Sequence, residues 1–526
     1  MFRRAFETQS PSPTCQQMLD RIVENRIHRA RDKFIDAIRP GDICSLASSY
    51  HDNDPCDFFK EPKRGSYNIC FFVQFRIDGK ISERGDRWVV RVPLSPCLAF
   101  GAQAKMEREF ATMQYVFLGR KTNAYANDFP LRLVAERTKI PIPRIQTCSL
   151  LCDNPGVITQ FMILEYVEGR TLSEVGLKTL SDEQRQHLYN QLACIYIQLR
   201  RLEFSSIGVL SCGPNGIDVC TRLISIGLNE QELEGLQPSC IHAGSRGRLV
   251  SASDYVCLLL NIAKNAFEKG KKSVYNEEDG NETLYNLHQF SQFTKETWLD
   301  HTLDNGPFVL AHGDLEPHNI MVNENMDIVA LLDWEWSRVV PLQFFMPPTW
   351  LTYRGTDLLA FPSLYTRYVS ELDNFRQAVK DQELKMYNGE LLLSNEWTRV
   401  HENGGILVQA ALDNWTEMDY FVARYLDHFL YRQKDLEGRI ERFMEEDPTR
   451  RAIIERKTRD FVAYGLELKS LGITDAAVPA SDVNMEMPCT WKQILSRFTL
   501  RRSSIVLVAG ASYLIWKYAH RSLITR

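Results

Sequence analysis

The chain lacks the features that mark several classes of protein. Its 62 basic and 67 acidic residues give a net charge of -5, so no basic excess indicates a nucleic-acid partner. The 13 cysteines are dispersed without a CxxC pair, which argues against a zinc motif and favours reduced thiols in a cytoplasmic protein. Residues 1–32 contain no apolar run, so we expect no secretory signal. The chain has no internal repeat and no long low-complexity tract.

Long hydrophobic runs are also scarce, and the one that stands out lies at residues 503–516, SSIVLVAGASYLIW. As a helix it would be roughly 21 Å long, which is short of the ~20 residues that cross a bilayer. Basic residues on both sides can extend its reach by snorkelling. The sequence leaves open a tail anchor in an intracellular membrane, an interfacial helix and a helix docked on the protein core.

Glycine is sparse where a phosphate-binding loop would need it. The turn at residues 65–68 has Gly65 and Ser66 before an alternating apolar run over 67–75, which predicts a strand. Such a turn can approach phosphates with its backbone, or it can be an ordinary turn. A second strand is predicted over 88–93 and a helix over 105–116, an order typical of a small lobe that covers a nucleotide.

Two charged residues of this small lobe are candidates for phosphate binding. Arg91 faces inward by the alternation of the second strand, so it can bind nucleotide phosphates. It can pair with Glu109 on the following helix, or with Glu107 as the second choice. The alternative is an ion pair at the surface, which contributes little.

The most informative run is HGDLEPHN at residues 312–319, followed by LLDWEW at 331–336. Asp314 follows the apolar run 308–311, so a strand would deliver it to a cleft where it can orient a hydroxyl and accept its proton. Asn319 and Asp333 offer a neutral and an anionic oxygen, which suit Mg²⁺ beside nucleotide phosphates. Strands predicted at 320–322 and 328–332 lie between them. The spacing matches the catalytic loop and metal segment of protein-kinase-like enzymes.

Other polar residues of these segments admit two interpretations. His312 can be a general base or a buried residue that holds the loop through hydrogen bonds, and we favour the second. Glu335 would point the same way as Asp333 on a strand and can help the metal site, or it is a solvated or core-edge acid. Glu316 is an awkward anion beside phosphates, which can bind a substrate amine or face outward.

Helical periodicity dominates the remainder of the chain. Helices are predicted over 181–199, with Ser181 as the cap, over 254–267 and over 284–298, with a polar link at 268–282. The helices after residue 350 are expected to form an acceptor pocket. They carry many acids, which favour an amine-bearing or hydroxylated substrate or are solvated faces: Glu396, Glu402, Asp413, Glu417 and Asp419.

Together these motifs resemble the aminoglycoside phosphotransferase and choline-kinase-like branch of the protein-kinase-like fold, in particular its fungal members. The motifs that carry the resemblance span roughly residues 60–350: GSYNICFFVQF, RWVVRVP, EFATM, TKIPIPRI, FMILEYVEG, QLRRLEFSSIGVL, LAHGDLEPHNIMV and LLDWEW. The resemblance implies a two-lobed α+β fold with a small β-rich N-lobe and a larger, mostly helical C-lobe. It also implies ATP in the cleft and transfer of the γ-phosphoryl group to a hydroxyl of a small molecule.

The resemblance assigns roles by motif. Asp314 would be the catalytic aspartate, Asn319 and Asp333 the Mg²⁺ ligands, and Glu109 the helix glutamate. The segment 164–167, which includes Glu165 and Val167, would be the hinge that meets adenine. The chain departs from the family pattern at Arg91, where many members have lysine, and at Glu316, where histidine is frequent.

The expected layout has four parts. They are an N-terminal extension (1–60), an N-lobe (61–166) with an insertion near 117–133, a C-lobe (167–472) and a C-terminal tail (473–526). The expected function is an ATP- and Mg²⁺-dependent small-molecule kinase. Arg91 and Glu316 motivate the alternative, a catalytically weak pseudokinase-type module that binds nucleotide. A third possibility, a membrane-tethered adaptor, rests on 503–516.

Overall fold

The computed structural model describes the chain from residue 20 to residue 473 with interruptions. The described ranges are 20–77, 80–81, 87–117, 138–150, 158–213, 216–220, 222–243, 248–353, 356–359, 361–398, 400–402, 404–430 and 435–473. The chain divides into two units, Met1–Asp460 and Phe461–Arg526. The predicted insertion after Phe117 and the apolar run 503–516 lie outside the described residues, so both stay predictions. Within the described ranges, no helix has both the length and the apolar composition to cross a bilayer.

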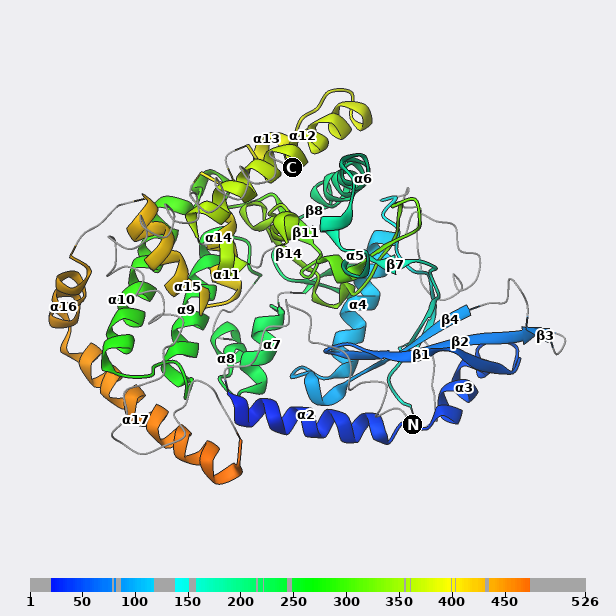
Figure 1. Ribbon diagram of the computed structural model, residues 1–526, viewed down its shortest axis with the longest axis horizontal. Coiled ribbons are helices and arrows are strands. Elements are labelled where there is room, and N and C mark those ends of the chain that lie inside the picture. The colour runs from blue at the N-terminus through cyan, green and yellow to red at the C-terminus, as the bar shows by residue number, and fades with distance from the viewer. Residues whose placement is uncertain are drawn as a thin grey trace, which may run out of the picture. The chain divides into compact units, whose positions relative to one another are not determined.

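An antiparallel sheet forms the N-terminal part of the first unit (Figure 1). Its strands follow the order β1-β2-β4-β6-β5, and β3 pairs with β2. The bounds are β1 Cys56–Arg64, β2 Asn68–Ile77, β3 Lys80–Ile81, β4 Arg87–Pro93, β5 Ile145–Cys148 and β6 Met162–Glu165. The strands predicted over 67–75 and 88–93 are confirmed as β2 and β4, with Cys70 opposite Arg91.

Two helices, α2 (Arg21–Asp36) and α3 (Pro40–Ser49), cover one face of this sheet (Figure 1). Because side chains alternate along a strand, the apolar residues of β2 share one face. The buried cluster between helices and sheet includes Val23, Ile27, Ile43, Leu46, Ile69, Phe71, Val73, Phe75, Val90 and Val92. Alternation therefore places Asn68 and Arg91 on the opposite face. The segment predicted as an extension supplies α2, α3 and the start of β1 to this packing, and its boundary at residue 60 stays a prediction.

The helix predicted over 105–116 is confirmed as α4 (Ala102–Phe117). Its buried Met106, Met113 and Val116 belong to the large hydrophobic cluster that continues through the helical part of the unit. Figure 1 shows α4 between the sheet and that helical part. This position gives α4 one face toward the sheet and another toward the segments that follow residue 300.

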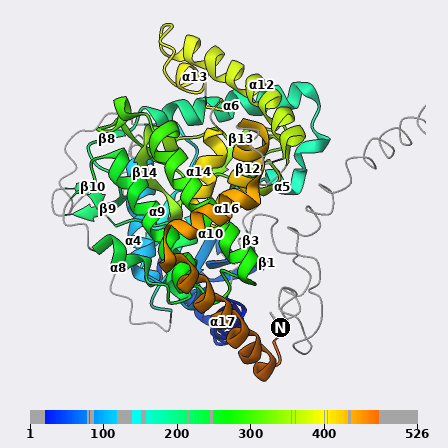
Figure 2. The same ribbon diagram turned by 90° about the vertical axis from the view of Figure 1, so that its left-hand side faces the viewer.

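Helices dominate the rest of the chain. Their bounds are α5 Leu172–Val175, α6 Asp182–Arg200, α7 Ile226–Leu233, α8 Pro238–Ala243, α9 Ala252–Lys269, α10 Glu277–Phe293, α11 Thr356–Leu359, α12 Pro362–Met386, α13 Leu393–Glu396, α14 Gly405–Asp413, α15 Glu417–Tyr420, α16 Leu436–Glu446 and α17 Pro448–Leu471. Figures 1 and 2 both show α12 alongside α6, where the Tyr189 hydroxyl donates to Glu371 over 2.5 Å.

Sequence patterns predicted the longer helices correctly, but they predicted too long a link between two of them. The Ser181 side chain caps α6 in a capping box with Gln184, as predicted for that serine. The polar link predicted over 268–282 is wrong over most of its length, since α9 runs to Lys269 and α10 begins at Glu277. Asn276 caps α10, and the acids of its first turn favour the positive end of the helix dipole.

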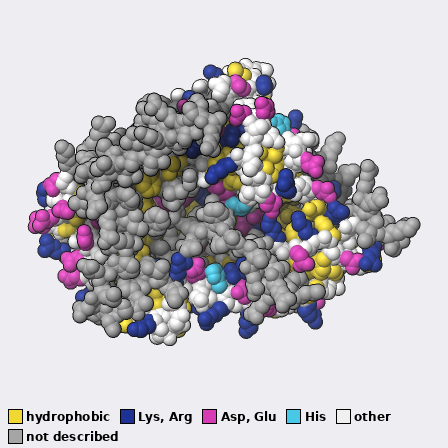
Figure 3. Space-filling view, in the orientation of Figure 1, with side chains coloured by type: hydrophobic (Ala, Val, Ile, Leu, Met, Phe, Trp, Pro, Cys, Tyr) yellow, Lys and Arg dark blue, Asp and Glu magenta, His cyan; other side chains and the backbone are white. Residues whose placement is uncertain are grey.

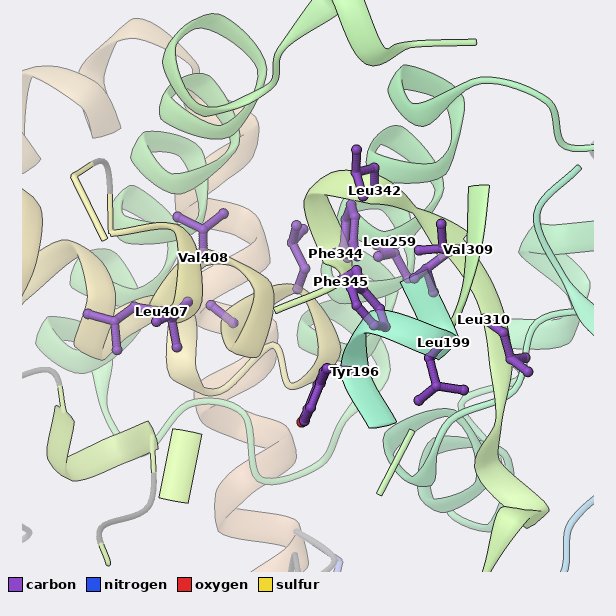
Figure 4. Packing of buried hydrophobic residues seen from close by; sticks show 14 of the residues in the cluster. Tyr196, Leu199, Leu259, Val309, Leu310, Leu342, Phe344, Phe345, Leu407 and Val408 are labelled. Atoms are coloured by element: carbon purple, nitrogen blue, oxygen red, sulfur yellow. The ribbon is translucent and has the colours of Figure 1, made fainter. Parts of the chain in front are cut away.

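Three small sheets lie among the helices. They consist of β8 (Glu203–Phe204), β11 (Phe308–Ala311) and β14 (Arg338–Pro341), of β7 (Arg170–Thr171), β12 (Ile320–Val322) and β13 (Ile328–Leu331), and of β9 (Val209–Gly213) and β10 (Gly216–Cys220). The strands predicted before and after the HGDLEPHN run are confirmed as β11, β12 and β13. Figure 4 shows part of the surrounding core, with labelled side chains from α6, α9, β11 and α14.

The described surface carries charges of both signs. On the face drawn in Figure 3, basic and acidic side chains are interspersed with hydrophobic ones. This distribution agrees with the small net charge of the chain.

Two buried arginines with the same exposure, 7%, differ in their partners. Arg338 donates to both oxygens of Asp413, at 2.8 and 2.6 Å. Arg108 on α4 has no hydrogen bond or ion pair to a described residue, and burial followed by the charge of Arg222 lowers its pKa to about 10. Burial of an unpaired charge costs stability, whereas loss of one member of a buried pair leaves the other uncompensated.

We therefore expect Arg108→Met to raise the free energy of unfolding. The matched Arg338→Met should destabilise the chain by about 3–5 kcal/mol because Asp413 loses its partner. Chemical denaturation of the two variants beside the unmodified chain measures both effects. A loss of stability in Arg108→Met equal to that in Arg338→Met would contradict the interpretation of Arg108 as an unpaired charge.

Candidate active site

The loop that carries Asp314 is fixed by a close backbone contact. Strand β11 ends at Ala311, and Gly313 follows with a φ of +82°. A Cβ at this glycine would lie 2.0 Å from the carbonyl oxygen of Trp336. Both the left-handed backbone and the lack of space require glycine here. The loop therefore lies directly against the segment that follows Asp333.

His312 holds this loop and is not free to act as a base. It is 3% exposed, and its Nε2 lies 2.9 Å from the Leu332 carbonyl oxygen, which can only accept a hydrogen bond. Nε2 therefore carries the proton, and Nδ1 accepts from the Asp314 N–H at 3.4 Å. Burial lowers the pKa of His312 to about 4, which keeps the ring neutral. The structure agrees with the role that the sequence favoured for this residue.

Asp314 and Asn319 lie in contact. The Asn319 amide nitrogen donates to the Asp314 carbonyl oxygen at 2.8 Å and to Asp314 Oδ2 at 2.9 Å. Because its nitrogen is engaged, the Asn319 Oδ1 is the atom left to bind a cation. His318 Nε2 lies 3.5 Å from Asp314 Oδ2. Burial opposes the charged form of His318, but Asp314 outweighs it and raises the pKa of the ring.

The hairpin of β12 and β13 brings Asp333 to the same place. Ile320 pairs with Leu331, and the Leu332 N–H donates to the Asn319 carbonyl oxygen at 2.9 Å. Asn319 and Asp333 therefore stand at the same end of the hairpin. Asp333 has a left-handed backbone with a φ of 60°.

One prediction for this segment is wrong: Glu335 does not lie on a strand with Asp333. Strand β13 ends at Leu331, and residues Trp334–Trp336 form a 3-10 turn. The left-handed turn at Asp333 breaks the strand, because its backbone leaves the β region. Trp334 and Trp336 are buried packing residues.

Glu335 instead reaches a buried group of charges between the sheet, α4 and the hairpin. It is 4% exposed, so the alternative of a solvated acid is excluded. Arg91 binds Glu109 and Asp333, and its Nη2 lies 3.3 Å from Glu335. Lys105 binds Glu335 and lies 3.1 Å from Glu109. Two cations thus hold three carboxylates.

The carboxyl groups of the cluster differ in pKa. Burial raises the pKa of Asp333 to about 6, aided by the charge of Glu335 and opposed by Arg91, although the Asp333 side chain keeps 40% of its surface exposed. The surrounding protein limits hydration of the carboxyl on its covered side. For Glu335, burial acts to raise the pKa, but Lys105 and Arg91 hold it below the ordinary value. Glu335 is therefore the permanently charged partner of the two cations.

From the sequence, we expected Glu316 to be an unfavourable negative charge next to the transferred phosphate. Burial, and then the charge of Asp314, raises the pKa of Glu316 to about 8. The carboxyl is therefore largely protonated at neutral pH. The repulsion expected from this side chain is accordingly smaller than its formal charge indicates.

The oxygens of Asn319 and Asp333 fit Mg²⁺. Magnesium takes one or two protein oxygens and completes its shell with phosphates and water. Within the described ranges, no group of three or more His, Cys, Asp or Glu residues forms a site that would hold a metal by protein atoms alone. A two-oxygen site beside a nucleotide is the arrangement that this donor set supports.

The residues predicted to contact the nucleotide lie in or near the sheet. The Gly65 N–H donates to the Asn68 carbonyl oxygen at 2.8 Å, so the glycine closes a turn before β2, with Ser66 inside it. The Glu165 carboxylate accepts from the Arg144 N–H at 2.9 Å. Val167 follows β6, and no hydrogen bond joins its N–H to a described residue. The nucleotide roles of these residues stay predictions.

The acids considered for an acceptor pocket are largely engaged elsewhere. Arg200 donates to Glu396 at 2.6–3.0 Å, and Arg338 holds Asp413. Asp419 accepts from Thr283 and Asn286, both at 3.2 Å. For Glu396, Asp413 and Asp419 these contacts support structural roles, which the sequence did not predict beside substrate binding and solvated faces.

Sequence reasoning missed Lys105 and gave Asn68 no specific role. Lys105 is 3% exposed and donates to the Asn68 side-chain oxygen, while the Asn68 amide donates to Glu335 at 3.0 Å. One signal was present: Lys105 and Glu109 are four residues apart on a predicted helix, which puts them on one face. The partnership with Glu335 had no local signal.

Residues 263–344 match the family described as "Phosphotransferase enzyme family". The matched range contains the loop 312–319 and the segment 331–336. A curated protein of Arabidopsis thaliana, "Probable acyl-CoA dehydrogenase IBR3", is 33% identical over 95 residues, which are 18% of this chain and 11% of that protein. The chain thus spans a small part of the curated relative that it matches.

Solved structures similar to this chain include an ADP-bound aminoglycoside phosphotransferase, APH(2'')-Ib. It is 14% identical, with 79% of this chain and 97% of that chain covered and a TM-score of 0.37. An ethanolamine kinase of Plasmodium vivax is 12% identical, with 85% and 98% covered and a TM-score of 0.35. At these scores the likeness carries no residue-by-residue correspondence. Residues 263–344 of this chain thus match the phosphotransferase enzyme family, and they lie within an α+β fold.

Proposed function

We propose that the chain is an ATP- and Mg²⁺-dependent phosphotransferase that moves the γ-phosphoryl group to a hydroxyl of a small molecule. One observation carries the proposal. The β11 loop and the β12–β13 hairpin bring Asp314, Asn319 and Asp333 together, and Arg91 reaches Asp333 from the sheet. An acid for the acceptor, two oxygens for a metal and a cation for phosphates are thus assembled from distant segments.

The proposed chemistry is an in-line displacement at phosphorus. The acceptor hydroxyl oxygen forms a bond to the γ-phosphorus while the bond to the bridging oxygen breaks, which leaves ADP. Asp314 orients the hydroxyl and accepts its proton. When bound, Mg²⁺ neutralises phosphate charge. Asn319 and Asp333 supply its protein oxygens, and Arg91 has donors that suit phosphate oxygens. The neutral His312 keeps the loop in place.

Nucleotide placement follows from the same arrangement. We propose that adenine meets the segment 164–167, where no hydrogen bond joins the Val167 N–H to a described residue and Glu165 accepts from the Arg144 N–H. The Gly65–Ser66 turn precedes β2, whose Asn68 belongs to the charge cluster. Phosphates bound near Arg91 would therefore lie next to this turn.

The test is phosphate transfer from γ-labelled ATP to a panel of hydroxyl-bearing metabolites. We expect transfer to at least one acceptor with Mg²⁺, and none with EDTA or with the Asp314→Ala chain. The Asp381→Ala chain, changed at a surface residue of α12, is the matched control and should retain the rate of the unmodified chain. Equal transfer by the Asp314→Ala chain would overturn the proposed mechanism.

A nucleotide-binding module without turnover is the second candidate. The observation that favours it is the contact of Arg91 with Asp333, which engages a carboxylate that a metal would need. Thermal stabilisation by ADP or ATP without Mg²⁺, together with no transfer to any acceptor, would support the module. Stabilisation that requires Mg²⁺ would favour the enzyme.

A further inference from the structure

The charge cluster is unusual in having a second cation that the proposed phosphotransfer chemistry does not use. Lys105 lies on α4 and is buried with Glu109 and Glu335, all at 4% exposure or less. Its ammonium contacts Glu335, Glu109 and the side-chain oxygen of Asn68. These partners come from the 3-10 turn after β13, from α4 itself and from β2.

We propose that Lys105 is a positioning residue that sets the charge and the geometry of the nucleotide-phosphate site. The inference rests on the proposed function, since it concerns how that site accepts a polyanion. Lys105 itself makes no contact with the phosphates in the proposed site. It acts through Glu335 and Glu109, which both contact Arg91.

The charge balance shows why a second cation is needed. Arg91 and Lys105 stand against Glu109, Asp333 and Glu335, which leaves one negative charge in excess. Without Lys105, Arg91 would face three carboxylates alone, and two negative charges would remain in excess. Solvent cannot compensate, because the contacts among Lys105, Glu109 and Glu335 are buried. A site of that charge would repel nucleotide phosphates more strongly.

The geometry supports the same role. Arg91 uses Nη1 for Glu109 and Nη2 for Asp333. Glu335 lies farther from Arg91, at 3.3 Å, because Lys105 and Asn68 hold its carboxylate. When Lys105 is lost, Glu335 has only Arg91 as a cationic partner and draws the guanidinium away from Asp333. Lys105 thus keeps Arg91 in place beside Asp333.

The test measures ADP affinity in the presence of Mg²⁺, by calorimetry, in a double-mutant cycle of Lys105→Met and Glu335→Gln. We expect Lys105→Met to weaken ADP binding by about tenfold or more, from the loss of one charge at short range. Glu335→Gln removes one acid and should strengthen binding. The double variant restores one excess negative charge, so its affinity should return to within about threefold of the unmodified chain.

The rescue distinguishes positioning from mere structural support. A purely structural lysine would leave the double variant at least as weak as Lys105→Met. Lys457→Met is the matched control, because Lys457 is equally buried and its ammonium bonds to the Glu268 and Gly270 carbonyl oxygens, away from the site. We expect that variant to lose stability and to keep its ADP affinity.

Each outcome bears on one proposal. If the unmodified chain binds no nucleotide, the proposed function fails. If the chain binds ADP and Lys105→Met binds it equally well, the inference about Lys105 is overturned and the proposed function stands. If Lys105→Met does not fold, the comparison of Glu335→Gln with the double variant decides. Equal ADP affinities in those two chains would overturn the inference, and weaker binding by the double variant would support it.

Discussion

Replacing Gly313 by alanine is expected to destabilise the chain by about 3 kcal/mol or more, the range of severe overpacking at a site that cannot relax. The new Cβ would lie 2.0 Å from the Trp336 carbonyl oxygen and 2.6 Å from its carbonyl carbon. Both atoms belong to the backbone, so no rotamer change relieves the clash. The loop and the segment after Asp333 would have to separate.

A second glycine isolates the steric part of this effect. Gly101 has the same φ of +82°, and a Cβ there would meet nothing within 4 Å. Gly101→Ala therefore carries the cost of a left-handed alanine alone, about 1 kcal/mol. Chemical denaturation of the two variants gives the difference. Equal losses of stability would show that the contact between Gly313 and Trp336 does not constrain the loop.

The same change tests how the loop and the metal segment are joined. Because Gly313 contacts Trp336, a shift of the loop displaces Asp314 relative to Asp333. We expect the folded fraction of Gly313→Ala to lose Mg²⁺-dependent stabilisation by ATP. Gly101→Ala should keep it.

Local patterns were sufficient for the strands and the longer helices, and they singled out the loop that carries Asp314. Alternation of apolar residues predicted β2 and β4, and helical spacing predicted α4 and α6. These periodicities can be read in a short window of sequence, because a strand or helix buries one of its faces regardless of which element packs against that face. The family resemblance of the motifs added the two-lobed architecture.

The partners of the buried charged residues could not be predicted from the sequence. Glu335 bonds to Asn68, which is 267 positions away, and to Lys105, so neither contact leaves a pattern in a short window. The strand expected through Glu335 failed for a related reason. The left-handed turn at Asp333 depends on how the segment packs against Gly313 and Arg91, and it has no signature in LLDWEW itself.

The Asp314→Asn change is expected to lower kcat for phosphate transfer by about 10²–10⁴-fold, the contribution of a positioned general base. An amide at this position cannot accept the proton of the acceptor hydroxyl. Its oxygen can still accept from the Asn319 amide, which now lies 2.9 Å from Asp314 Oδ2. The loop should therefore keep its fold, and ADP affinity should change by less than about threefold, since no phosphate ligand is lost.

Asp327→Asn is the matched control, because Asp327 is an exposed aspartate on the turn between β12 and β13, where it binds Asn323 and His187. Steady-state kinetics should show an unchanged kcat for this variant. The division between kcat and nucleotide affinity separates two roles for Asp314. A large loss of ADP affinity with a small loss of kcat would place Asp314 in nucleotide binding. The predicted pattern, a loss confined to kcat, would place it at the acceptor, where the β11 loop presents its carboxylate beside the oxygens of Asn319 and Asp333.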